Sequence, residues 1–514
     1  MAPLNFWNIA RDEPERVALV DPAGHERTYG NLNAGCNQLV RGLRALGLQP
    51  GDAIAAMLPN SPEAMELHLA VQQAGWYLIP INFHLVGPEV AYLIKDSEAK
   101  VFVTHESFAP AALAATTELS FPLDHCFAVG HIQGFGAYEQ LKAGQPVDRP
   151  PNRTLGMVMN YTSGTTGRPK GVRRPLPGTE PDDSMFGALR GYGIEPFDDN
   201  VHLLCCPWYH TAPLVMVNPS LHMGHKVVIM DRFLPERFLQ LVQQQRVTVT
   251  HVVPTQFVRL LALPDEVRAR YDISSFRSVI HGAAPCPPDA KRKMIEWFGP
   301  VLDEYYASTE GVGGTIVHSE DWLKKPGTVG KPRPEVEMLI LDDSGNEVPR
   351  GQVGTIYTKS LRGSVEYFKD PEKTARGRHG QHFTVGDVGY LDEDGYLFLA
   401  DRKIDMIISG GVNIYPIEIE NVIIGHPKVL DVAVFGIPNE EWGEEIKAVI
   451  EPVPGDEAGP SLAADILAYC DGKMARYKLP KSIDFVAAMP RDPSGKLYKR
   501  KLREPYWQGR QRAI

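Results

Sequence analysis

Short apolar segments alternate along this chain with segments of helical periodicity, and this alternation restricts the fold more than any other feature. Between the apolar segments, nonpolar side chains recur at helical spacing, as at Leu32, Leu39 and Leu43. Ser61 followed by Pro62 is typical of a helix start. The apolar segments predict strands at 53–58, 76–81, 100–104, 201–206, 226–230 and 248–253. Because a strand–helix–strand order places successive strands parallel under covering helices, we predict an α/β fold with a mostly parallel sheet.

The pattern changes near residue 384. The Asp394-Gly395 pair between two apolar segments predicts a β-hairpin over 390–399. Pro416 is typical of the first position of a helix, and Ser461 of the cap of a second helix. Further strands are predicted at 431–436, 447–452 and 482–487. These elements describe a small α+β unit.

A chain of 514 residues is too long for one hydrophobic core, since domains usually contain about 100–200 residues. Hydrophobic residues make up 43% and charged residues 23%, which is typical of a globular protein and excludes a disordered or collagen-like chain. We place the domain boundary at 401–403. The predicted domains are therefore 1–401 and 402–514.

Several function classes are disfavoured by composition. The formal net charge of −10 argues against a uniformly basic nucleic-acid-binding protein. The six cysteines show no C-x-x-C spacing, so we expect reduced, mostly buried thiols instead of a zinc site or a disulfide framework. The chain has no secretory leader pattern and no run of about 18 apolar residues, so we expect a cytoplasmic protein without a transmembrane segment.

Residues 161–172 read YTSGTTGRPKGV and form the most informative segment. Glycines allow the backbone to turn tightly and to bring N–H groups close to an anion. Hydroxyl groups add hydrogen-bond donors, and Lys170 adds a mobile positive charge. The spacing is not that of a Walker loop, because no Ser or Thr follows the lysine. The segment predicts a polyphosphate-binding loop.

This loop resembles that of the adenylate-forming enzymes, which include acyl-CoA synthetases, luciferases and the adenylation domains of peptide synthetases. The resemblance covers nearly the whole chain. It implies a large N-terminal domain of layered, mostly parallel sheets with helices and a small β-barrel-like part, followed by a small mobile α+β domain. It also implies that the loop holds the β- and γ-phosphates of ATP, with Thr165 contributing to a Mg²⁺ site. The loop residues concerned are Thr162, Ser163, Gly164, Thr165, Thr166, Gly167 and Lys170.

A second motif of the family resembles residues 305–311, which read YYASTEG. By this resemblance, Tyr306 packs on adenine, Thr309 contacts the α-phosphate and Glu310 holds Mg²⁺, which suits a hard carboxylate oxygen. Ala307 stands where the family usually has glycine. The segment beginning at His281 resembles the loop whose backbone lines the adenine pocket. Its pocket residues are Gly282, Ala283 and Ala284.

Two further motifs complete the nucleotide site. Residues 383–389, FTVGDVG, are similar to the family's Thr-Gly-Asp motif, in which Asp387 accepts hydrogen bonds from the ribose hydroxyls. Val385 replaces the usual threonine of that motif, and Arg402 matches a family arginine that contacts ribose and phosphate. Lys496, in PRDPSGKLYKRKLR, matches the lysine required for adenylation.

The resemblance implies two half-reactions. A carboxylic acid attacks the α-phosphate of ATP to give acyl-AMP and pyrophosphate, and the thiolate of coenzyme A (CoA) then displaces AMP. Lys496, Lys170 and Mg²⁺ on Glu310 offset the repulsion between the anions. Between the steps the small domain rotates and a loop with Gly410 and Gly411 lines the pantetheine tunnel. The hinge position holds Ile404, where the family usually has Asp or Lys.

The small domain carries a concentration of positive charge. Residues 473–512 contain twelve Lys and Arg against three Asp and Glu, a net of +9 that leaves −19 for the rest of the chain. We expect these charges to face the anionic substrates as a cationic lid. The tail is also compatible with peripheral contact with a membrane, although it lacks a clear amphipathic anchor.

The acid is predicted from the segment WYHTAP, which resembles the opening of the acyl pocket and places His210 near the substrate carboxylate. No Asp lies between Pro207 and Pro213, which argues against an amino acid substrate. Gly311, Gly313 and Gly314 are expected to leave space along the pocket wall. We therefore expect a fatty or a bulky hydrophobic or cyclic acid.

Three alternatives remain beside an acid–CoA ligase. The first is an acyl-AMP ligase that loads the pantetheine arm of a carrier protein. The second is a catalytically inactive nucleotide-binding scaffold, which predicts the loss of Lys496 or Glu310, and both residues are present. The third is a light-producing oxygenase that shares the same motifs. An assay for CoA-dependent release of AMP separates the CoA ligase from the carrier-protein ligase.

Overall fold

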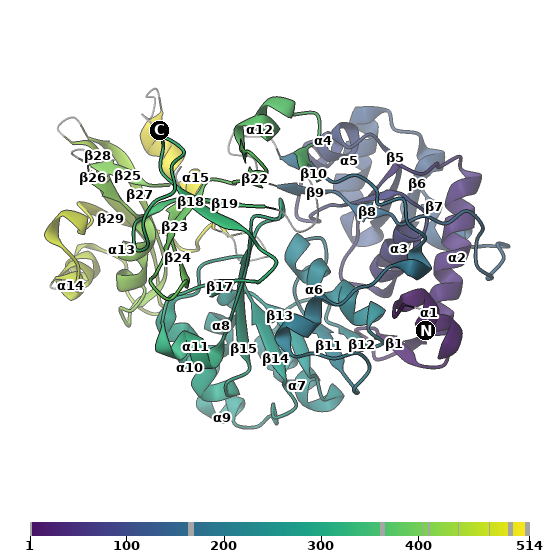
Figure 1. Cartoon of the computed structure of the whole chain (residues 1–514), viewed down its shortest axis with the longest axis horizontal. Coiled ribbons are helices and arrows are strands. Elements are labelled where there is room, and N and C mark those ends of the chain that lie inside the picture. Colours follow the sequence, from purple (N-terminus) through teal and green to yellow (C-terminus); the bar gives the residue numbers. More distant parts are fainter. Residues whose placement is uncertain are drawn as a thin grey trace. The chain divides into compact units, whose positions relative to one another are not determined.

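The computed structural model describes residues 3–162, 169–359, 365–402, 405–409, 412–439, 442–471, 473–491 and 497–508, with the backbone alone at 401, 402 and 413 (Figure 1). The chain forms two compact units. Unit 1 comprises Met1–Val252, Ala262–Ile280 and Arg362–Arg376, and unit 2 comprises Val253–Leu261, His281–Leu361 and Gly377–Ile514. No helix within the described ranges combines the length and the apolar character that crossing a membrane requires.

Unit 1 contains a six-stranded sheet in which every pairing is parallel. In sheet order the strands are β7 (Gly136–Ala137), β6 (Cys126–Val129), β5 (Ala99–His105), β3 (Ala53–Met57), β4 (Tyr77–Pro80) and β8 (Met157–Val158). The predicted strands at 53–58, 76–81 and 100–104 correspond to β3, β4 and β5, and the mostly parallel sheet is confirmed.

Strand β3 shows that this sheet is covered on both faces. Ile54 and Ala56 belong to one apolar cluster, and Ala55 and Met57 belong to another. Successive side chains of a strand point to opposite faces, so each cluster fills one side of the sheet. The first cluster includes side chains of α2 and α3, and the second includes those of α4 and α5. These helices are α2 (Tyr29–Ala45), α3 (Pro62–Gln72), α4 (Gly87–Asp96) and α5 (Ala109–Leu119).

A second sheet of unit 1 contains the later predicted strands. Strands β1, β12, β11 and β13 pair in parallel, and β2 pairs antiparallel with β1. Six consecutive strands of this nine-stranded sheet are, in sheet order, β14 (Ser278–His281), β13 (Val249–Val252), β11 (Val201–Leu204), β12 (Lys226–Ile229), β1 (Val17–Val20) and β2 (Glu26–Thr28). The remaining helices of unit 1 are α1 (Phe6–Asp12), α6 (Thr211–His222), α7 (Pro235–Gln245), α9 (Asp265–Arg268) and α12 (Pro371–Arg376).

Unit 2 is built mainly from antiparallel strands. Three consecutive antiparallel strands are β15 (Leu302–Ala307), β16 (Gly313–His318) and β17 (Lys331–Pro332). A six-stranded sheet contains β18 (Met338–Leu341), β19 (Gly354–Thr358), β21 (Arg378–His379), β22 (His382–Phe383), β23 (Asp387–Leu391) and β24 (Leu397–Arg402). The predicted hairpin is β23–β24. Helices α8 (Pro254–Leu261), α10 (Pro288–Phe298) and α11 (Ser319–Lys324) also belong to this unit.

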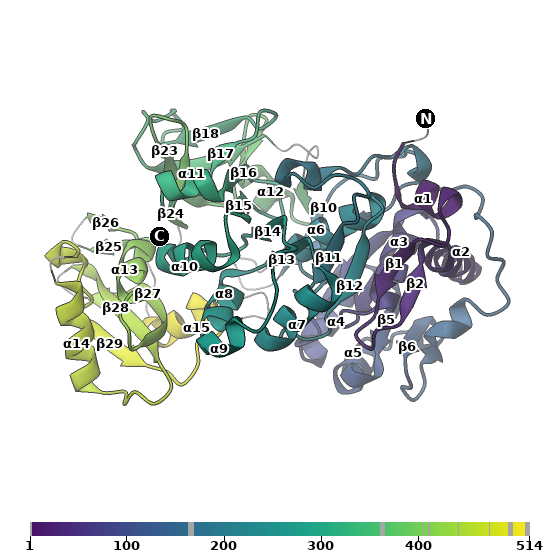
Figure 2. The ribbon, with the colours of Figure 1, turned by 90° about the horizontal axis from the view of Figure 1, so that it is seen from below.

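The C-terminal part of unit 2 is a five-stranded sheet with helices on both faces. Figure 2 shows α14 and α15 on opposite sides of it. Val432 and Val434 pack with α13 and α14, while Ala433 and Phe435 pack with the segment that carries α15. The strands are β25 (Ile407–Ser409), β26 (Val412–Ile414), β27 (Val429–Asn439), β28 (Gly443–Pro452) and β29 (Ser482–Phe485). The helices are α13 (Pro416–Ile423), α14 (Pro460–Cys470) and α15 (Lys499–Arg503).

Most predicted helix starts are confirmed, and one is wrong. The hydroxyl of Ser61 accepts a hydrogen bond from the N–H of Ala64, and Pro62 begins α3. Pro416 begins α13. Ser461 does not cap α14, because the helix already begins at Pro460 and Ser461 lies in its first turn. Proline suits the first helical position, because an N–H group there would have no acceptor within the helix and because the φ angle of proline is already helical.

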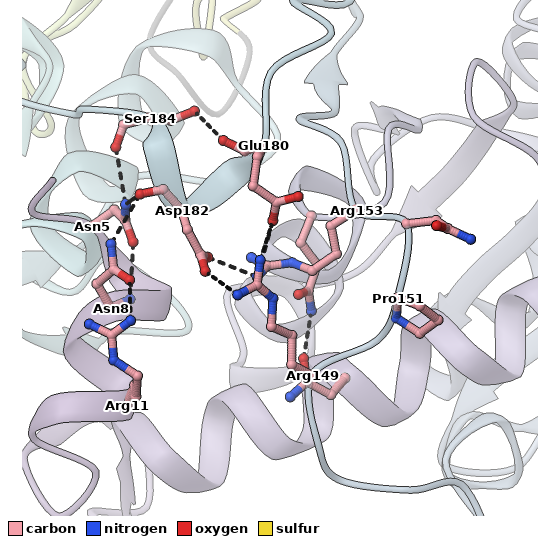
Figure 3. A network of polar contacts seen from close by, with 12 residues as sticks. Asn5, Asn8, Arg11, Arg149, Pro151, Arg153, Glu180, Asp182 and Ser184 are labelled. Atoms are coloured by element: carbon pink, nitrogen blue, oxygen red, sulfur yellow. Dashed lines mark hydrogen bonds and ion pairs between the residues drawn. The ribbon is translucent and has the colours of Figure 1, made fainter. Parts of the chain in front are cut away.

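A network of polar contacts fastens the segment between β10 (Lys170–Arg173) and β11 to the N-terminal helix (Figure 3). Arg153 has a buried side chain, and its Nη1 lies 2.8 Å from Oδ1 of Asp182. Arg149 contacts the other carboxylate oxygen of Asp182 at 2.9 Å. The side-chain amides of Asn5 and Asn8 donate to the carbonyl of Asp182 at 2.8 and 3.0 Å. These contacts hold an irregular segment that lies between β10, which carries Lys170, and β11, which precedes His210 in the chain.

Unit 1 also buries several neutral histidines. The Nδ1 of His222 accepts a hydrogen bond from the N–H of Phe6 at 3.1 Å, and its Nε2 lies 3.2 Å from Oε1 of Gln72. Burial lowers the pKa of His222 well below its ordinary value, that of His68 to about 4, and those of His202 and His251 to about 3. Protonation of these imidazoles therefore favours the unfolded chain.

We predict that unit 1 loses stability as the pH falls below about 6.5. Below this pH the histidines of the unfolded chain bind protons, whereas the buried imidazoles of the folded chain stay neutral. This difference lowers the free energy of unfolding by about 2 kcal/mol per histidine at pH 5. The measurement is the midpoint of thermal unfolding between pH 7.5 and 5, with His68→Gln as a variant that should flatten the pH dependence. A midpoint that does not change over this range would contradict the prediction.

Candidate active site

The predicted phosphate loop is carried by a β-hairpin of unit 1. Strand β9 (Asn160–Thr162) pairs antiparallel with β10, so that Thr162 lies opposite Lys170 in the register. The Nζ of Lys170 lies 3.3 Å from Oδ2 of Asp370, just before α12. The N–H of Lys373 and the nearby ammonium of Lys170 hold the pKa of Asp370 below its usual range. The hairpin therefore places the charge of Lys170 at the base of the loop, balanced by one carboxylate.

The predicted acid-binding segment follows the carboxyl end of β11. Trp208 is buried, and its Nε1 donates to the carbonyl of Leu58 at 2.8 Å. His210 immediately precedes α6, and its ring centroid lies 4.4 Å from that of Tyr209. His210 therefore lies at the amino-terminal end of a twelve-residue helix, where the helix dipole favours an anion.

Asn60 shapes this segment and was missed by the sequence analysis. Its amide Nδ2 donates to the carbonyls of Cys206 and Met230 at 3.0 and 2.9 Å, and its Oδ1 accepts from the N–H of Trp208 at 2.8 Å. The side chain is buried and therefore joins β11, β12 and the turn before α6. A polar residue between two prolines, in LPNSP, was the available signal, but that pattern is equally typical of an ordinary turn.

The predicted adenine loop begins in unit 2 where β14 ends. Gly282 is buried, and a Cβ there would lie 2.7 Å from both the ring and the carbonyl oxygen of Tyr305, so that only glycine fits. Ala283 is exposed and has a φ of +65°, which is a strained conformation for a residue with a side chain. The loop thus presents strained, accessible backbone beside β15, as a site that uses main-chain groups requires.

Two residues that were assigned separately are in direct contact. The hydroxyl of Tyr306, in β15, donates a hydrogen bond to Oδ2 of Asp387, in β23, at 2.7 Å. Arg402 lies opposite Asp387 in the β23–β24 register. The structure therefore brings together the predicted base-binding and ribose-binding positions, which are 81 residues apart in the chain.

The Thr309-Glu310 pair lies in a tight turn between β15 and β16. The N–H of Ser308 donates to the carbonyl of Val312 at 2.7 Å, and the hydroxyl of Ser308 accepts from the N–H of Val312 at 3.1 Å. Glu310 is 6% exposed. The turn holds a buried glutamate, whose carboxylate oxygens suit Mg²⁺ chemically, on a backbone fixed by the hydrogen bonds between Ser308 and Val312.

The glycines after Glu310 are explained by backbone geometry as well as by the space they leave. Gly313 and Gly314 both have a φ of +99°. A Cβ on Gly313 would lie 2.5 Å from the carbonyl oxygen of Tyr306, and one on Gly314 would lie 2.8 Å from the side chain of Val336. The path of the chain therefore requires glycine at both positions, and the expectation that they leave space along the pocket wall stays a prediction.

The remaining predicted site residues lie outside the described residues or are described in part. Ser163, Gly164, Thr165, Thr166 and Gly167 lie outside the described residues, as do the hinge residue Ile404, the tunnel glycines Gly410 and Gly411, and Lys496. Of the others, Thr162, Lys170 and His210 belong to unit 1, whereas residues 282–284, 306–310 and 387–402 belong to unit 2.

The basic C-terminal block is less free than its composition predicts. Among the described residues, five of its basic side chains form ion pairs within unit 2: Lys478 with Glu418, Arg491 with Asp431, Lys499 with Glu420, Arg500 with Glu504, and Arg503 with Asp405. Arg491 binds both oxygens of Asp431, at 2.5 and 2.7 Å. The composition therefore overstates the unpaired positive charge at these residues, and for four of the five the acidic partner lies far away in the sequence. The cationic lid that faces the substrates stays a prediction.

An α/β chain with a hydroxyl-rich hairpin loop, a strained backbone loop that packs on Tyr305, and a carboxylate bound by the neighbouring Tyr306 has the features of a nucleotide-binding enzyme. Residues 6–367 match the AMP-binding enzyme family, and residues 418–496 match its C-terminal domain. The chain belongs to this family. Both matches agree with the predicted order of a large and a small domain, while the boundary at 401–403 stays a prediction.

Similarity to individual proteins extends over nearly the full chain. The long-chain-fatty-acid–CoA ligase FadD13 of Mycobacterium tuberculosis is 35% identical, with 96% of each chain covered. A fatty acid–[acyl-carrier-protein] ligase, ScoC of Streptomyces coeruleorubidus, is 32% identical, with 97% of this chain and 95% of that one covered. The structure of the anthranilate CoA ligase AuaEII with anthranoyl-AMP has a TM-score of 0.85 at 26% identity, covering 98% of each chain. The chain is, with these relatives, an AMP-forming acid–thiol ligase.

We predict that Tyr306→Phe weakens AMP binding about five- to tenfold. The change keeps the aromatic ring but removes the hydroxyl that orients Asp387, and one such hydrogen bond to a charged group contributes about 1–1.5 kcal/mol. Isothermal titration calorimetry with AMP measures the effect. Tyr469→Phe is a matched control, because it removes a hydroxyl that donates to the carbonyl of Gly425. Equal affinities in Tyr306→Phe and the parent protein would contradict the assigned role.

Proposed function

We propose that this protein activates a fatty or a bulky hydrophobic or cyclic acid as acyl-AMP and transfers the acyl group to the thiol of CoA. The observation that carries the proposal is the hydrogen bond between Tyr306 and Asp387. It joins a ring suited to a base and a carboxylate suited to a ribose, next to the turn that holds Thr309 and Glu310. A site for the adenosine part of ATP follows from these four residues.

The first half-reaction must bring an ionised acid to the α-phosphate of ATP. In the proposed site, the hydroxyls of Thr162, Ser163, Thr165 and Thr166 and the backbone at Gly164 and Gly167 bind the terminal phosphates, and Lys170 balances their charge. Lys496 adds a positive charge near the bond that forms, and Thr309 contacts the α-phosphate. No general base is needed, because a carboxylic acid is ionised at neutral pH. Orientation and charge stabilisation therefore account for most of the catalysis.

A divalent cation fits the proposed site. Glu310 supplies the hard oxygen that Mg²⁺ prefers, on a turn fixed by Ser308 and Val312. Glu310 and Thr165 would hold the ion, which would neutralise phosphate charge. Asp387 and Arg402 would bind the ribose, while Gly282, Ala283 and Ala284 would contact the base through their backbone, next to Tyr306 and Ala307.

The second half-reaction requires a path for the thiol. We propose that residues 402–514 act as a lid that rotates about the segment near Arg402, withdraws Lys496 and brings Gly410 and Gly411 to the pantetheine arm. Glycine suits this position, because no side chain narrows the path. Carrier-protein transfer remains the second candidate, because ScoC is named as an acyl-carrier-protein ligase.

The class of acid is inferred from the segment before α6. His210 at the start of that helix suits a carboxylate, and no Asp between Pro207 and Pro213 is present to bind an ammonium group. FadD13 is named for long-chain fatty acids and AuaEII for anthranilate. A long-chain fatty acid is aliphatic and anthranilate carries an aromatic ring, which agrees with a fatty or a bulky cyclic substrate.

We predict that incubation with ATP, Mg²⁺, CoA and a panel of aliphatic and cyclic acids yields AMP and a thioester. The measurement is AMP and acyl-CoA by liquid chromatography, with holo acyl carrier protein replacing CoA in a second series. Release of AMP that depends on CoA supports the CoA ligase, and release that depends on the carrier protein supports the second candidate. No AMP with any acid would contradict the proposal and favour an inactive scaffold.

We predict that Lys496→Ala abolishes acyl-AMP formation but largely spares thioester formation from supplied acyl-AMP. The ammonium group stabilises charge in the first step only, so that the loss should be about 10²–10³-fold in that step. Pyrophosphate release and acyl-CoA formation measure the two steps separately. Lys499→Ala is a matched control, because Lys499 is paired with Glu420 at 2.8 Å. An equal loss in both steps would contradict the assigned role.

A further inference from the structure

A lysine without any exposed surface lies in unit 2, outside every motif of the proposed site. Lys291, on α10, is 0% exposed, and its Nζ lies 2.6 Å from Oε2 of Glu304 in β15. The same ammonium lies 4.7 Å from the ring centroid of Trp322 in α11. Lysine is almost never fully buried unless it is paired, and burying a charged pair costs free energy, so we asked what this ion pair does in the fold.

The pair joins elements that carry the proposed adenine site. Glu304 lies two residues before Tyr306 in β15, so the two side chains point to the same face of the strand. Tyr306 in turn donates to Asp387. A shift of β15 by a fraction of an ångström at Glu304 therefore reaches the aromatic ring and, through its hydroxyl, the carboxylate.

The same carboxylate also lies near the start of the adenine loop. The Nε2 of His281 is 3.9 Å from Oε2 of Glu304, and His281 is buried next to Gly282. The ring of Phe257, in α8, contacts the imidazole of His281 with centroids 5.1 Å apart. Gly282 packs directly on Tyr305, the residue after Glu304. The positions of Tyr306 and of the loop that begins at Gly282 thus both depend on the position of Glu304.

Burial makes this arrangement sensitive to the loss of either charge. The low polarity around Glu304 raises the pKa of its carboxyl, and the ammonium of Lys291 acts against that shift. Without Lys291, the carboxyl group must take up a proton or move towards water, and in either case β15 loses its anchor to α10 and α11. Breaking one partner of a buried pair is consequently more harmful than removing both.

We propose that the Lys291–Glu304 ion pair is a positioning element for the adenine nucleotide: it sets where β15 presents Tyr306 and where the loop from Gly282 to Ala284 lies. The proposal rests on the function assigned above to Tyr306 and to this loop. It makes the affinity for the nucleotide, and not the affinity for the acid, depend on two residues that touch neither substrate.

Kinetic constants of Lys291→Met and Glu304→Gln test this role. We expect KM for ATP to rise about tenfold in each variant, while KM for the acid changes less than about twofold, because misplacement of a binding group by less than 1 Å is sufficient for such losses. Calorimetric titration with AMP should show the same weakening without turnover. The double variant should lose less than the two single variants together, since the second change removes the carboxyl that the first leaves unpaired.

Lys142→Met provides a matched control in unit 1. Lys142 pairs with the buried carboxylate of Glu66 at 3.0 Å, so its loss also breaks a buried ion pair. We expect a lower unfolding temperature but an unchanged KM for ATP. If Lys291→Met does not fold, Glu304→Gln, which keeps an acceptor for the ammonium, carries the test.

The outcomes separate the two proposals. Parallel changes in both KM values, or lower stability with neither KM changed, would overturn the positioning role while leaving the ligase activity intact. Absence of thioester from the parent protein with every acid would overturn the proposed function, and the AMP titrations would still decide the positioning role. Selective loss of nucleotide affinity in both single variants, with the control unchanged, supports it.

Discussion

The parallel pairing of buried strands is the constraint on which unit 1 depends. A strand such as β3 is apolar on both faces, because Ile54 and Ala56 serve one cluster while Ala55 and Met57 serve the other. Parallel strands need a crossover for every pairing, and the crossover helices supply both covers. The polar loops must then lie at the strand ends. The turn after β11, with Trp208 and His210, is such a loop. Asn60 follows the end of β3 by three residues, and its side chain binds the backbone of this turn.

Polar side chains that join separate elements determine the details of the candidate site. Asp182 fastens the segment between β10 and β11 through Arg149 and Arg153 (Figure 3). Tyr306 and Asp387 link β15 to β23 in unit 2, and Lys291 and Glu304 link the same strand to a helix. In each case a buried or half-buried group is satisfied by a partner on another element of the fold. Such contacts are costly to break, because the remaining partner keeps its desolvation penalty.

Local chemistry explains which expectations agreed with the structure. Ser61 and Pro62 begin α3, and Asp394-Gly395 turns the β23–β24 hairpin, because caps and turns are set by neighbouring residues. Ser461 was wrongly predicted as a cap. Serine is typical of the cap and proline of the first helical position, and here the helix begins at Pro460, so Ser461 lies inside it. The unpaired charge of the basic block was overestimated for a different reason. Its partners, such as Glu418 and Asp431, precede it by about 60 residues, and composition cannot reveal such pairings.

Periodicity and turn chemistry were sufficient to predict the α/β class and the main strands, while the residues of the nucleotide site follow from the resemblance of the motifs and stay a prediction. These features act over a few residues, and their chemistry is visible in the residue types. The hydrogen bond from Tyr306 to Asp387, the clamp made by Asn60 and the burial of Lys291 were decided by tertiary structure alone. An isolated lysine in a helix is equally consistent with a solvated surface charge. Only the packing of α10 against β15 and α11 removes water from it, and that removal makes its pairing with Glu304 obligatory.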